Sequence, residues 1–419
     1  MISRLGASYT DWAKKEWCII ILYTLISLQF YAYVGFSNTM IKLPLFLTVP
    51  LMLAYCWNTF IKNVPNRLFL LMRWLVLFNI MAILCAFVFW RQSIVLGYRA
   101  MAVEFTLLFY FYLMQRKPSI QSLEKYVFIF GVLYIVLWIY AMNQFPVPVF
   151  GFNEDGEVKE DLSRGILRIN FGRKMFLVLA YFIALNRGYV LRKKIWFAIA
   201  SIFFIVIVLQ VTRQLILWTG LITIIYVFQK NKKLLVIGVV FFMILFALGR
   251  TVKFSPDSIV GTMINLTEEQ IESNKAGDEN IRITEYRYFF TQWSRNIVAD
   301  IIGNGFPHGD SLYGRYNTNL EERQELYLSD VGYGRMKVVT GIAGMIVYLA
   351  LFVRCCLIRM PSHLAWTKMF MLLFALLNLA SAPYSTADGQ ITMCICVYLM
   401  TIYALPKMNK KRFNILKSK

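Results

Sequence analysis

About twelve windows of roughly 20 mostly apolar residues run through this chain of 419 residues. A window of this length is what an α-helix needs to cross the hydrocarbon core of a bilayer. The composition agrees, because 58% of the residues are hydrophobic and only 16% are charged, which is too apolar for a soluble domain of this length. The sequence therefore predicts an all-α integral membrane protein. The predicted spans lie near 17–35, 41–60, 68–90, 94–114, 126–146, 171–187, 195–212, 214–229, 233–250, 331–357, 367–384 and 390–406.

The distribution of charge predicts the orientation of these spans. If the N-terminus is cytoplasmic, the inner segments hold 24 Lys and Arg against three acidic residues, so the whole net charge of +21 falls on one side. This is the positive-inside pattern, and it favours twelve spans with both termini inside. No small-residue cleavage site follows the basic start, which predicts an uncleaved first helix. The same pattern accounts for the excess of basic residues without nucleic acid as a partner.

The predicted spans divide the chain into three regions. Residues 1–250 form a bundle of nine spans with an outer loop at 147–170, and residues 251–330 form a large outer loop. Residues 331–419 form the last three spans and a basic cytoplasmic tail. Long ordered loops in compact proteins usually carry function. We therefore expect the functional residues on the outer face.

Arginines on the outer side are the first candidates for a binding site. Arg164 and Arg168 are four residues apart and would share one face of a helix. They either reach to the membrane interface as long cations do, or bind phosphate, which a guanidinium matches in geometry. Arg213, in "QVTRQLILW", lies at a tight outer junction between two spans. It is either an interfacial anchor or a ligand for an anionic group that enters from the bilayer.

The stretch "RITEYRYFFTQWSR" is the second candidate. Helical spacing predicts an apolar stripe of Ile283, Tyr286, Phe290, Trp293 and Ile297. At about 100° per residue, Arg282 and Arg287 flank this stripe and Arg295 points nearly opposite. The stretch therefore predicts an amphipathic helix that packs on the bundle or lies in the interface. A stripe of this kind is often only a packing surface.

Other catalytic patterns are missing from the sequence. The two histidines, His308 and His363, fall on opposite predicted sides of the membrane, and the seven cysteines lie in or beside spans. There is no phosphate-binding glycine loop and no outer acidic pair for a metal-bound nucleotide sugar. We therefore predict no metal, no cofactor and no disulfide. Glu104 is the only clear carboxylate at mid-membrane, which counts against an ion-coupled transporter.

Three motifs, in order and on the outer side, resemble one known superfamily. They are Thr212-Arg213-Gln214, the segment from Arg282 to Gly303 and Gly305, and "SDVGYGRMKVVTGIAG" with its Gly-x-x-Gly. Together they resemble the O-antigen polymerase and ligase superfamily, bacterial inner-membrane glycosyltransferases that use polyprenyl-diphosphate-linked glycans. Ligases carry His-Asn-x-x-Leu about eleven residues before the first of these glycines, where this chain has Asp330-Val331-Gly332. The departure favours polymerase over ligase.

The resemblance implies a polyprenyl-phosphate-sugar (GT-C-like) glycosyltransferase fold with a periplasmic active site. It implies that a diphosphate is bound by Arg213 and Arg282, with Arg287, Arg168 and Arg164 as further candidates. Asp330 or Glu285 would accept the proton of the acceptor hydroxyl; Asp330 is equally well explained as a helix N-cap. Direct attack without a metal would invert the anomeric carbon.

The product of such an enzyme would be O-antigen, capsular or exopolysaccharide. A chain-length regulator and a flippase are the implied protein partners. The alternatives are a ligase that transfers the glycan to a lipid acceptor, a flippase or other transporter of lipid-linked oligosaccharide, and a teichoic-acid-type transferase.

Overall fold

The computed structural model describes residues 14–32, 36–62, 64–144, 147, 149, 173–210, 212–230 and 281–404, which form helices and no strands. In the first half these are α1 (Lys14–Leu28), α2 (Asn38–Ile61), α3 (Arg67–Trp90), α4 (Ile94–Met101), η1 (Val103–Leu107), α5 (Leu108–Arg116) and α6 (Ile120–Asn143). The next are α7 (Met175–Leu191), α8 (Lys194–Leu209), α9 (Arg213–Lys230), α12 (Ile281–Thr291), α13 (Ile297–Ile302) and α14 (Leu312–Gln324). The last are η3 (Leu328–Asp330), α15 (Gly332–Leu357), η4 (Ser362–Leu364), α16 (Ala365–Leu377), η5 (Pro383–Ser385) and α17 (Ala387–Tyr403).

Several of these helices could span a membrane. Four are long and apolar enough to cross it, and a bent pair, α4 with η1 and α5, makes a fifth. Five shorter apolar helices occupy other predicted spans. The chain is thus an all-helical membrane protein, as its composition predicts. The number of twelve spans stays a prediction, and the window at 233–250 lies outside the described residues.

Several helices begin directly after a residue whose side chain caps them. Asn66 caps α3 by accepting the Leu68 N–H at 2.9 Å, and Ser119 caps α6 by accepting the Ser122 N–H at 3.2 Å. A side-chain oxygen at this position satisfies an amide that has no partner inside the helix. The starts of these spans are therefore fixed by single polar residues beside the apolar windows.

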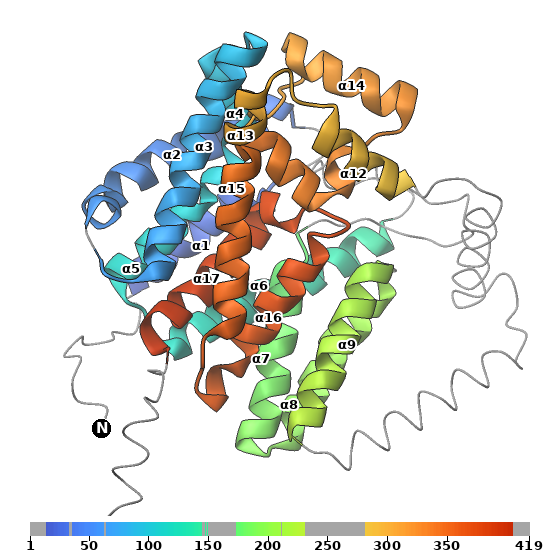
Figure 1. The fold of residues 1–419 in the computed structure, drawn as a ribbon. Coiled ribbons are helices and arrows are strands. Elements are labelled where there is room, and N and C mark those ends of the chain that lie inside the picture. The colour runs from blue at the N-terminus through green and yellow to red at the C-terminus, as the bar shows by residue number, and fades with distance from the viewer. Residues whose placement is uncertain are drawn as a thin grey trace, which may run out of the picture.

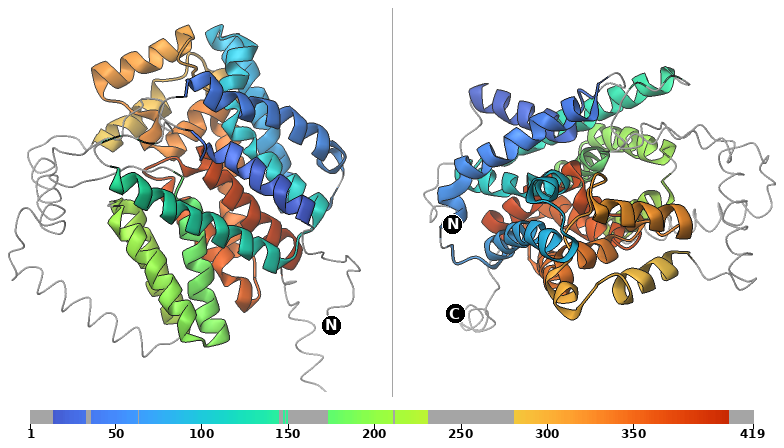
Figure 2. Two further views of the ribbon diagram at one scale, coloured as in Figure 1. Left: turned by 180° about the vertical axis from the view of Figure 1, so that it is seen from behind. Right: turned by 90° about the horizontal axis from the view of Figure 1, so that it is seen from above.

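Two central helices, α7 and α17, are surrounded by the others. Nearly every side chain of α7 from Met175 to Gly188, and of α17 from Ala387 to Met400, is buried. A helix that is apolar all round is expected in such a position. The pair α1–α2 lies on one side of them and the pair α8–α9 on the opposite side (Figure 2). The helices α12, α13 and α14 gather with α4 at one end of the bundle (Figure 1).

The predicted span at 94–114 is not one straight helix. It is bent by 55° between α4 and η1. At the bend, the Asn79 side chain of α3 donates to the Glu104 backbone carbonyl at 3.0 Å, and the Glu104 carboxylate accepts from the Gln390 amide of α17. These polar partners replace hydrogen bonds that a straight helix would make internally, which is how a broken helix is tolerated at membrane depth. An apolar window does not reveal such a break.

A second irregularity joins α13 to α15. Gly341 interrupts α15 with φ 72° and ψ 178°, and the turn after α13 has Gly303 at φ 102° and Gly305 at φ 76°. The Asn304 and Gly305 amides donate to the Val338 and Val339 carbonyls at 2.8 and 3.1 Å. The kink in α15 thus exposes carbonyls that the glycine turn satisfies. Glycine is the residue that adopts such φ values without a steric penalty.

Candidate functional site

Arg282 ties three segments together at the start of α15. Its Nη1 donates to the backbone carbonyls of Asp330 and Ala380, both at 2.7 Å, and its Nη2 lies 3.5 Å from Asp330 Oδ2. About a third of the side chain is exposed. Arg282 therefore connects α12 to the entrance of α15 and to the segment between α16 and α17. The sequence predicts Arg282 as a phosphate ligand; in the structure, Arg282 positions these three segments.

Asp330 lies in η3, directly before α15. The helix is preceded by Val331 as N-cap, without a side-chain hydrogen bond, so Asp330 does not cap it. Instead its carboxylate pairs with Arg282 and accepts from Ser329 Oγ at 3.3 Å. About half of the side chain is exposed. Asp330 is thus an accessible carboxylate whose orientation is set by an arginine.

Glu285 is the buried carboxyl of this group. It lies one helical turn after Arg282, is 1% exposed, and its Oε1 accepts the Tyr327 amide at 3.0 Å. Burial raises the pKa of Glu285 to about 7, and the charge of Asp330 also acts to raise this pKa while Arg282 acts to lower it. Its place and its contact make Glu285 a link between α12 and the segment before α15. Of the two predicted proton acceptors, Asp330 is the one that solvent reaches.

The predicted apolar stripe of α12 is wrong. Ile283 and Ile297 are 56% and 76% exposed, whereas the buried side chains are Glu285, Phe289 and, beyond the helix, Trp293. The helix ends at Thr291, so the later members of the stripe do not belong to it. The apolar periodicity misled because α12 docks partly through polar groups, including Arg282 and Glu285. Its isoleucines instead remain on the outside.

The other arginines of this stretch do not join Arg282. Arg287 lies on the exposed side of α12. Arg295, beyond the helix end, stacks over the Trp90 ring at 4.1 Å and donates to the Phe89 carbonyl at 3.3 Å. Such a cation–π contact fixes the loop after α12 to the end of α3. Arg295 is therefore exposed to solvent on one side and stacked on the end of α3 on the other.

Arg213 lies in a second polar group, at the junction of α8 and α9. It is the first residue of α9 and is partly buried. The neighbouring Thr212 hydroxyl accepts from Lys174 Nζ at 2.8 Å. Gln210, which ends α8, is 5% exposed, and neither its amide nitrogen nor its amide oxygen has a hydrogen-bond partner among the described residues. Two cations and an unsatisfied amide thus gather where two spans meet.

The start of α7 completes this second group. The Asp388 carboxylate of α17 accepts the Met175 amide at 2.8 Å. Arg173 donates to the Ser27 carbonyl at 3.3 Å and to the Gln29 side chain at 2.7 Å, and it interacts electrostatically with Asp388. Arg173 and Lys174, adjacent in sequence, thus hold the ends of α1 and α9 beside α7. From the sequence alone, Lys174 is a cation next to a span, a position typical of an interfacial anchor.

The segment 378–388 lies between the two groups of residues. Its Ala380 carbonyl binds Arg282, its Asn378 and Leu379 carbonyls accept from the Tyr286 hydroxyl, and its Asp388 holds the start of α7. Arg282, Asp330 and Glu285 therefore form one group, and Arg213 with Lys174 forms another. Arg164 and Arg168 lie outside the described residues, as does nearly all of the loop at 147–170.

Sequence reasoning missed a cluster of buried polar residues behind this segment. The Arg335 guanidinium interacts electrostatically with Glu104 and Tyr384, and it stacks over the Phe306 ring at 4.5 Å. Among the described residues, the hydroxyls of Tyr384 and Ser385 make no well-formed hydrogen bond, although Tyr384 lies beside Arg335 and Ser385 beside Glu104. Arg335 is a charge inside a predicted span, and this is the signal that could have identified it. Buried polar groups without partners are places where water or a polar ligand is expected.

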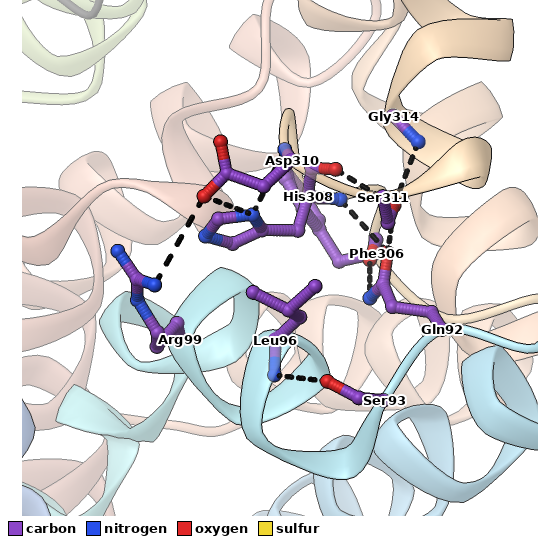
Figure 3. A network of polar contacts seen from close by, with 9 residues as sticks. All are labelled: Gln92, Ser93, Leu96, Arg99, Phe306, His308, Asp310, Ser311 and Gly314. Atoms are coloured by element: carbon purple, nitrogen blue, oxygen red, sulfur yellow. Dashed lines mark hydrogen bonds and ion pairs between the residues drawn. The ribbon is translucent and has the colours of Figure 1, made fainter.

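His308 occupies a separate position near α4 (Figure 3). Its Nδ1 lies 3.6 Å from the Asp310 carboxylate, which in turn lies 4.0 Å from the Arg99 guanidinium. The buried Gln92 side chain accepts from the His308 amide and from Ser311 Oγ, and donates to the Phe306 carbonyl. These contacts hold the turn from 306 to 311 on the end of α3.

The comparison with known proteins adds no relative. Neither the protein-family models nor the curated proteins contain a match to this chain. Within the described ranges, no three His, Cys, Asp or Glu side chains converge as metal ligands would. All seven cysteines are free thiols. The functional groups that the described site offers are its arginines, a lysine and carboxylates.

Proposed function

We propose that this chain is a membrane glycosyltransferase that joins polyprenyl-diphosphate-linked oligosaccharide units into a polysaccharide at the outer face of the bacterial inner membrane. The observation that carries the proposal is the group at the junction of α7, α8 and α9. There Lys174, Arg213 and the buried Gln210 amide gather at one end of two apolar helices. Cations at such a position suit an anionic group attached to a lipid.

The helix geometry supports an anionic ligand at this junction. The helices α7 and α9 both begin there, and the N-terminus of a helix carries a partial positive charge and free amides. The Asp388 carboxylate satisfies the Met175 amide of α7. Arg213 and Lys174 add full positive charges, of which the guanidinium can pair with phosphate bidentately. We assign the diphosphate of the donor to Arg213 and Lys174, with Arg282, Arg287, Arg168 and Arg164 as further candidates.

The proposed reaction is a direct displacement. A hydroxyl of the acceptor sugar attacks the anomeric carbon of the donor, the bond from that carbon to the diphosphate oxygen breaks, and the lipid diphosphate leaves with the bonding electrons. The configuration at that carbon is inverted. The leaving group is a stable anion, so positioning and charge stabilisation matter most. Arginine and lysine provide this stabilisation, and no metal or other cofactor is part of the proposal.

The acceptor proton passes to a carboxylate, for which we propose Asp330. Its side chain is about half exposed and is oriented by Arg282. Glu285 is buried and accepts a hydrogen bond from the Tyr327 amide, so it helps to position the segment that carries Asp330. A carboxylate acting as general base contributes roughly 10²- to 10⁴-fold to rate. This arrangement also accounts for an aspartate at the position where ligases of the resembled superfamily carry histidine.

Deleting the gene and profiling the surface glycan tests the proposal. Single repeat units on the final acceptor, with long chains lost, are the expected result for a polymerase. Long chains stranded on the lipid carrier would instead identify a ligase, the second candidate. An unchanged profile, or repeat units trapped on the cytoplasmic leaflet, would contradict both and favour a transporter. Repeating the assay with purified protein and lipid-linked repeat units separates direct catalysis from an indirect effect.

A further inference from the structure

An apolar groove runs between α6 and α8. Its volume is about 450 Å³, and every residue that lines it is apolar. The lining includes Phe128, Val132 and Val136 of α6 with Trp196, Ile199 and Phe203 of α8. In the lipid environment of a membrane protein such a groove accepts a hydrocarbon chain.

The helix α6, which forms one wall of this groove, packs closely on α7. Gly131 of α6 lies so close to α7 that an added Cβ would come within 3.0 Å of the Ala180 methyl and 3.4 Å of the Phe203 ring. The glycine lets α6 approach α7 closely, as small residues do between membrane helices. The larger side chains before and after Gly131 then stand out as the groove wall. The position of this wall therefore depends on the close contact between α6 and α7.

One end of the groove carries positive charge. The Arg187 guanidinium covers the Trp196 ring at 4.6 Å and the Phe128 ring at 5.9 Å, and it is paired with Glu124. Exposed basic side chains adjoin this end: Lys125 on α6, and Arg192, Lys193 and Lys194 at the start of α8. These residues belong to the segments that the charge distribution predicts to be cytoplasmic. Arg187 thus places a charge beside the rings of Phe128 and Trp196, and exposed basic residues lie near the same end of the groove.

We propose that the groove binds an acyl chain of an anionic phospholipid from the cytoplasmic leaflet, with the phosphate held by Lys193 and Lys194. Charge complementarity carries this choice of occupant, because basic residues at the cytoplasmic end of membrane helices attract anionic headgroups. From Trp196 to Phe203 the helix rises about 10 Å, at 1.5 Å per residue, which suits part of one acyl chain. The proposed polyprenyl diphosphate would have its charge at the opposite membrane surface, by Arg213.

Native mass spectrometry of the purified full-length protein tests the site. The protein is titrated with phosphatidylglycerol, phosphatidylcholine or a polyprenyl phosphate, and bound lipid is counted. The variants are Lys193→Gln with Lys194→Gln, which removes the headgroup contact, and Val136→Trp, which fills the groove. Lys62→Gln with Arg67→Gln removes two exposed charges elsewhere on the same predicted side, and Ile205→Trp adds a ring on an exposed part of α8 outside the groove lining.

The expected result is one phosphatidylglycerol bound more tightly than phosphatidylcholine. The double lysine variant should weaken it roughly tenfold to thirtyfold, Val136→Trp should abolish it, and both controls should retain it. Equal binding of the two phospholipids, an equal loss in the controls, or no retained lipid in any form would overturn the proposal. Displacement of phosphatidylglycerol by the polyprenyl phosphate, sensitive to Val136→Trp, would assign the groove to the polyprenyl chain instead. None of these readouts depends on glycosyltransferase activity.

Discussion

Gly303 and Gly341 meet backbone to backbone where the turn after α13 crosses the kink of α15. A Cβ on Gly303 would lie 2.3 Å from the Val339 carbonyl oxygen, and a Cβ on Gly341 would lie 2.2 Å from the Ile301 carbonyl oxygen. Both residues also have positive φ. The contact holds α12, α13 and the turn that follows them on α15. It thereby fixes the position of α12, which carries Arg282 and Glu285, relative to the bundle.

Replacing Gly341 by alanine should destabilise the protein strongly. The Cβ would strain a backbone at φ 72° and would force the two segments apart. We expect the free energy of unfolding to fall by roughly 2 to 4 kcal/mol, measured by denaturant unfolding in detergent. Gly309→Ala, whose Cβ would meet no atom within 4 Å, should change it by less than about 0.5 kcal/mol. Equal stability of the two variants would show that the backbone contact is not constrained.

Replacing Arg282 by alanine should cost both stability and activity. The sequence alone predicts normal protein levels, but the structure gives Arg282 two backbone carbonyls to satisfy, those of Asp330 and Ala380. Leaving these carbonyls without a donor should cost roughly 1 to 3 kcal/mol. Arg282→Lys keeps a positive donor and should recover part of the stability. Thermal unfolding and membrane abundance measure the effect, and an Arg282→Ala protein as stable as the unmodified chain would contradict it.

The sequence predicted the helical spans better than it predicted the site. Apolar windows mark most of the spans, because burial in lipid depends on local composition. The bend at Glu104 depends on Asn79 and Gln390, which lie far away in the sequence, so no local pattern shows it.

The way in which α12 packs on the bundle could not be predicted from the sequence, for a related reason. A periodicity of apolar residues cannot reveal that a glutamate and an arginine form the buried side. The sequence shows only that the motifs with Arg282 and Asp330 follow one another along the chain. It does not show that the two side chains contact each other. Lys174 and Gln210 gave no signal that distinguishes them from other polar residues beside spans.

Glu285 should make the stability depend on pH. Burial raises its pKa in the folded protein to about 7 from an ordinary 4.5, so the folded chain keeps a proton that the unfolded chain releases. Stability should therefore fall as the pH rises from about 4.5 to 7, by roughly 2 to 3 kcal/mol in all. Unfolding measured at pH 5 and pH 8 tests this. Glu285→Gln should remove most of the difference, whereas Glu322→Gln, at an exposed site, should leave it in place.

The variant Asp330→Asn distinguishes a role of Asp330 in the ion pair with Arg282 from a role in catalysis. The exposed pair with Arg282 contributes at most about 1 kcal/mol, and the backbone carbonyl of residue 330 still accepts from Arg282 in the variant. Stability should therefore stay close to that of the unmodified protein, while polymer synthesis from purified lipid-linked repeats should fall roughly 10²-fold or more. A fully active Asp330→Asn would exclude Asp330 as the proton acceptor.

Replacing Arg213 or Lys174 should reduce activity without unfolding the protein. Both side chains are partly exposed at the starts of helices, so we expect only a modest loss of stability, whereas each replacement removes a positive charge from the proposed diphosphate site. We expect a loss of roughly 10²- to 10³-fold for Arg213→Ala, and a smaller loss for Arg213→Lys, which keeps the charge but not the bidentate geometry. The rate should be measured at saturating and at low donor concentration.

The matched control is Arg295→Ala, because Arg295 is a cation of the same predicted outer side that stacks on Trp90. A comparable loss in Arg295→Ala, or full activity in Arg213→Ala, would place the diphosphate elsewhere.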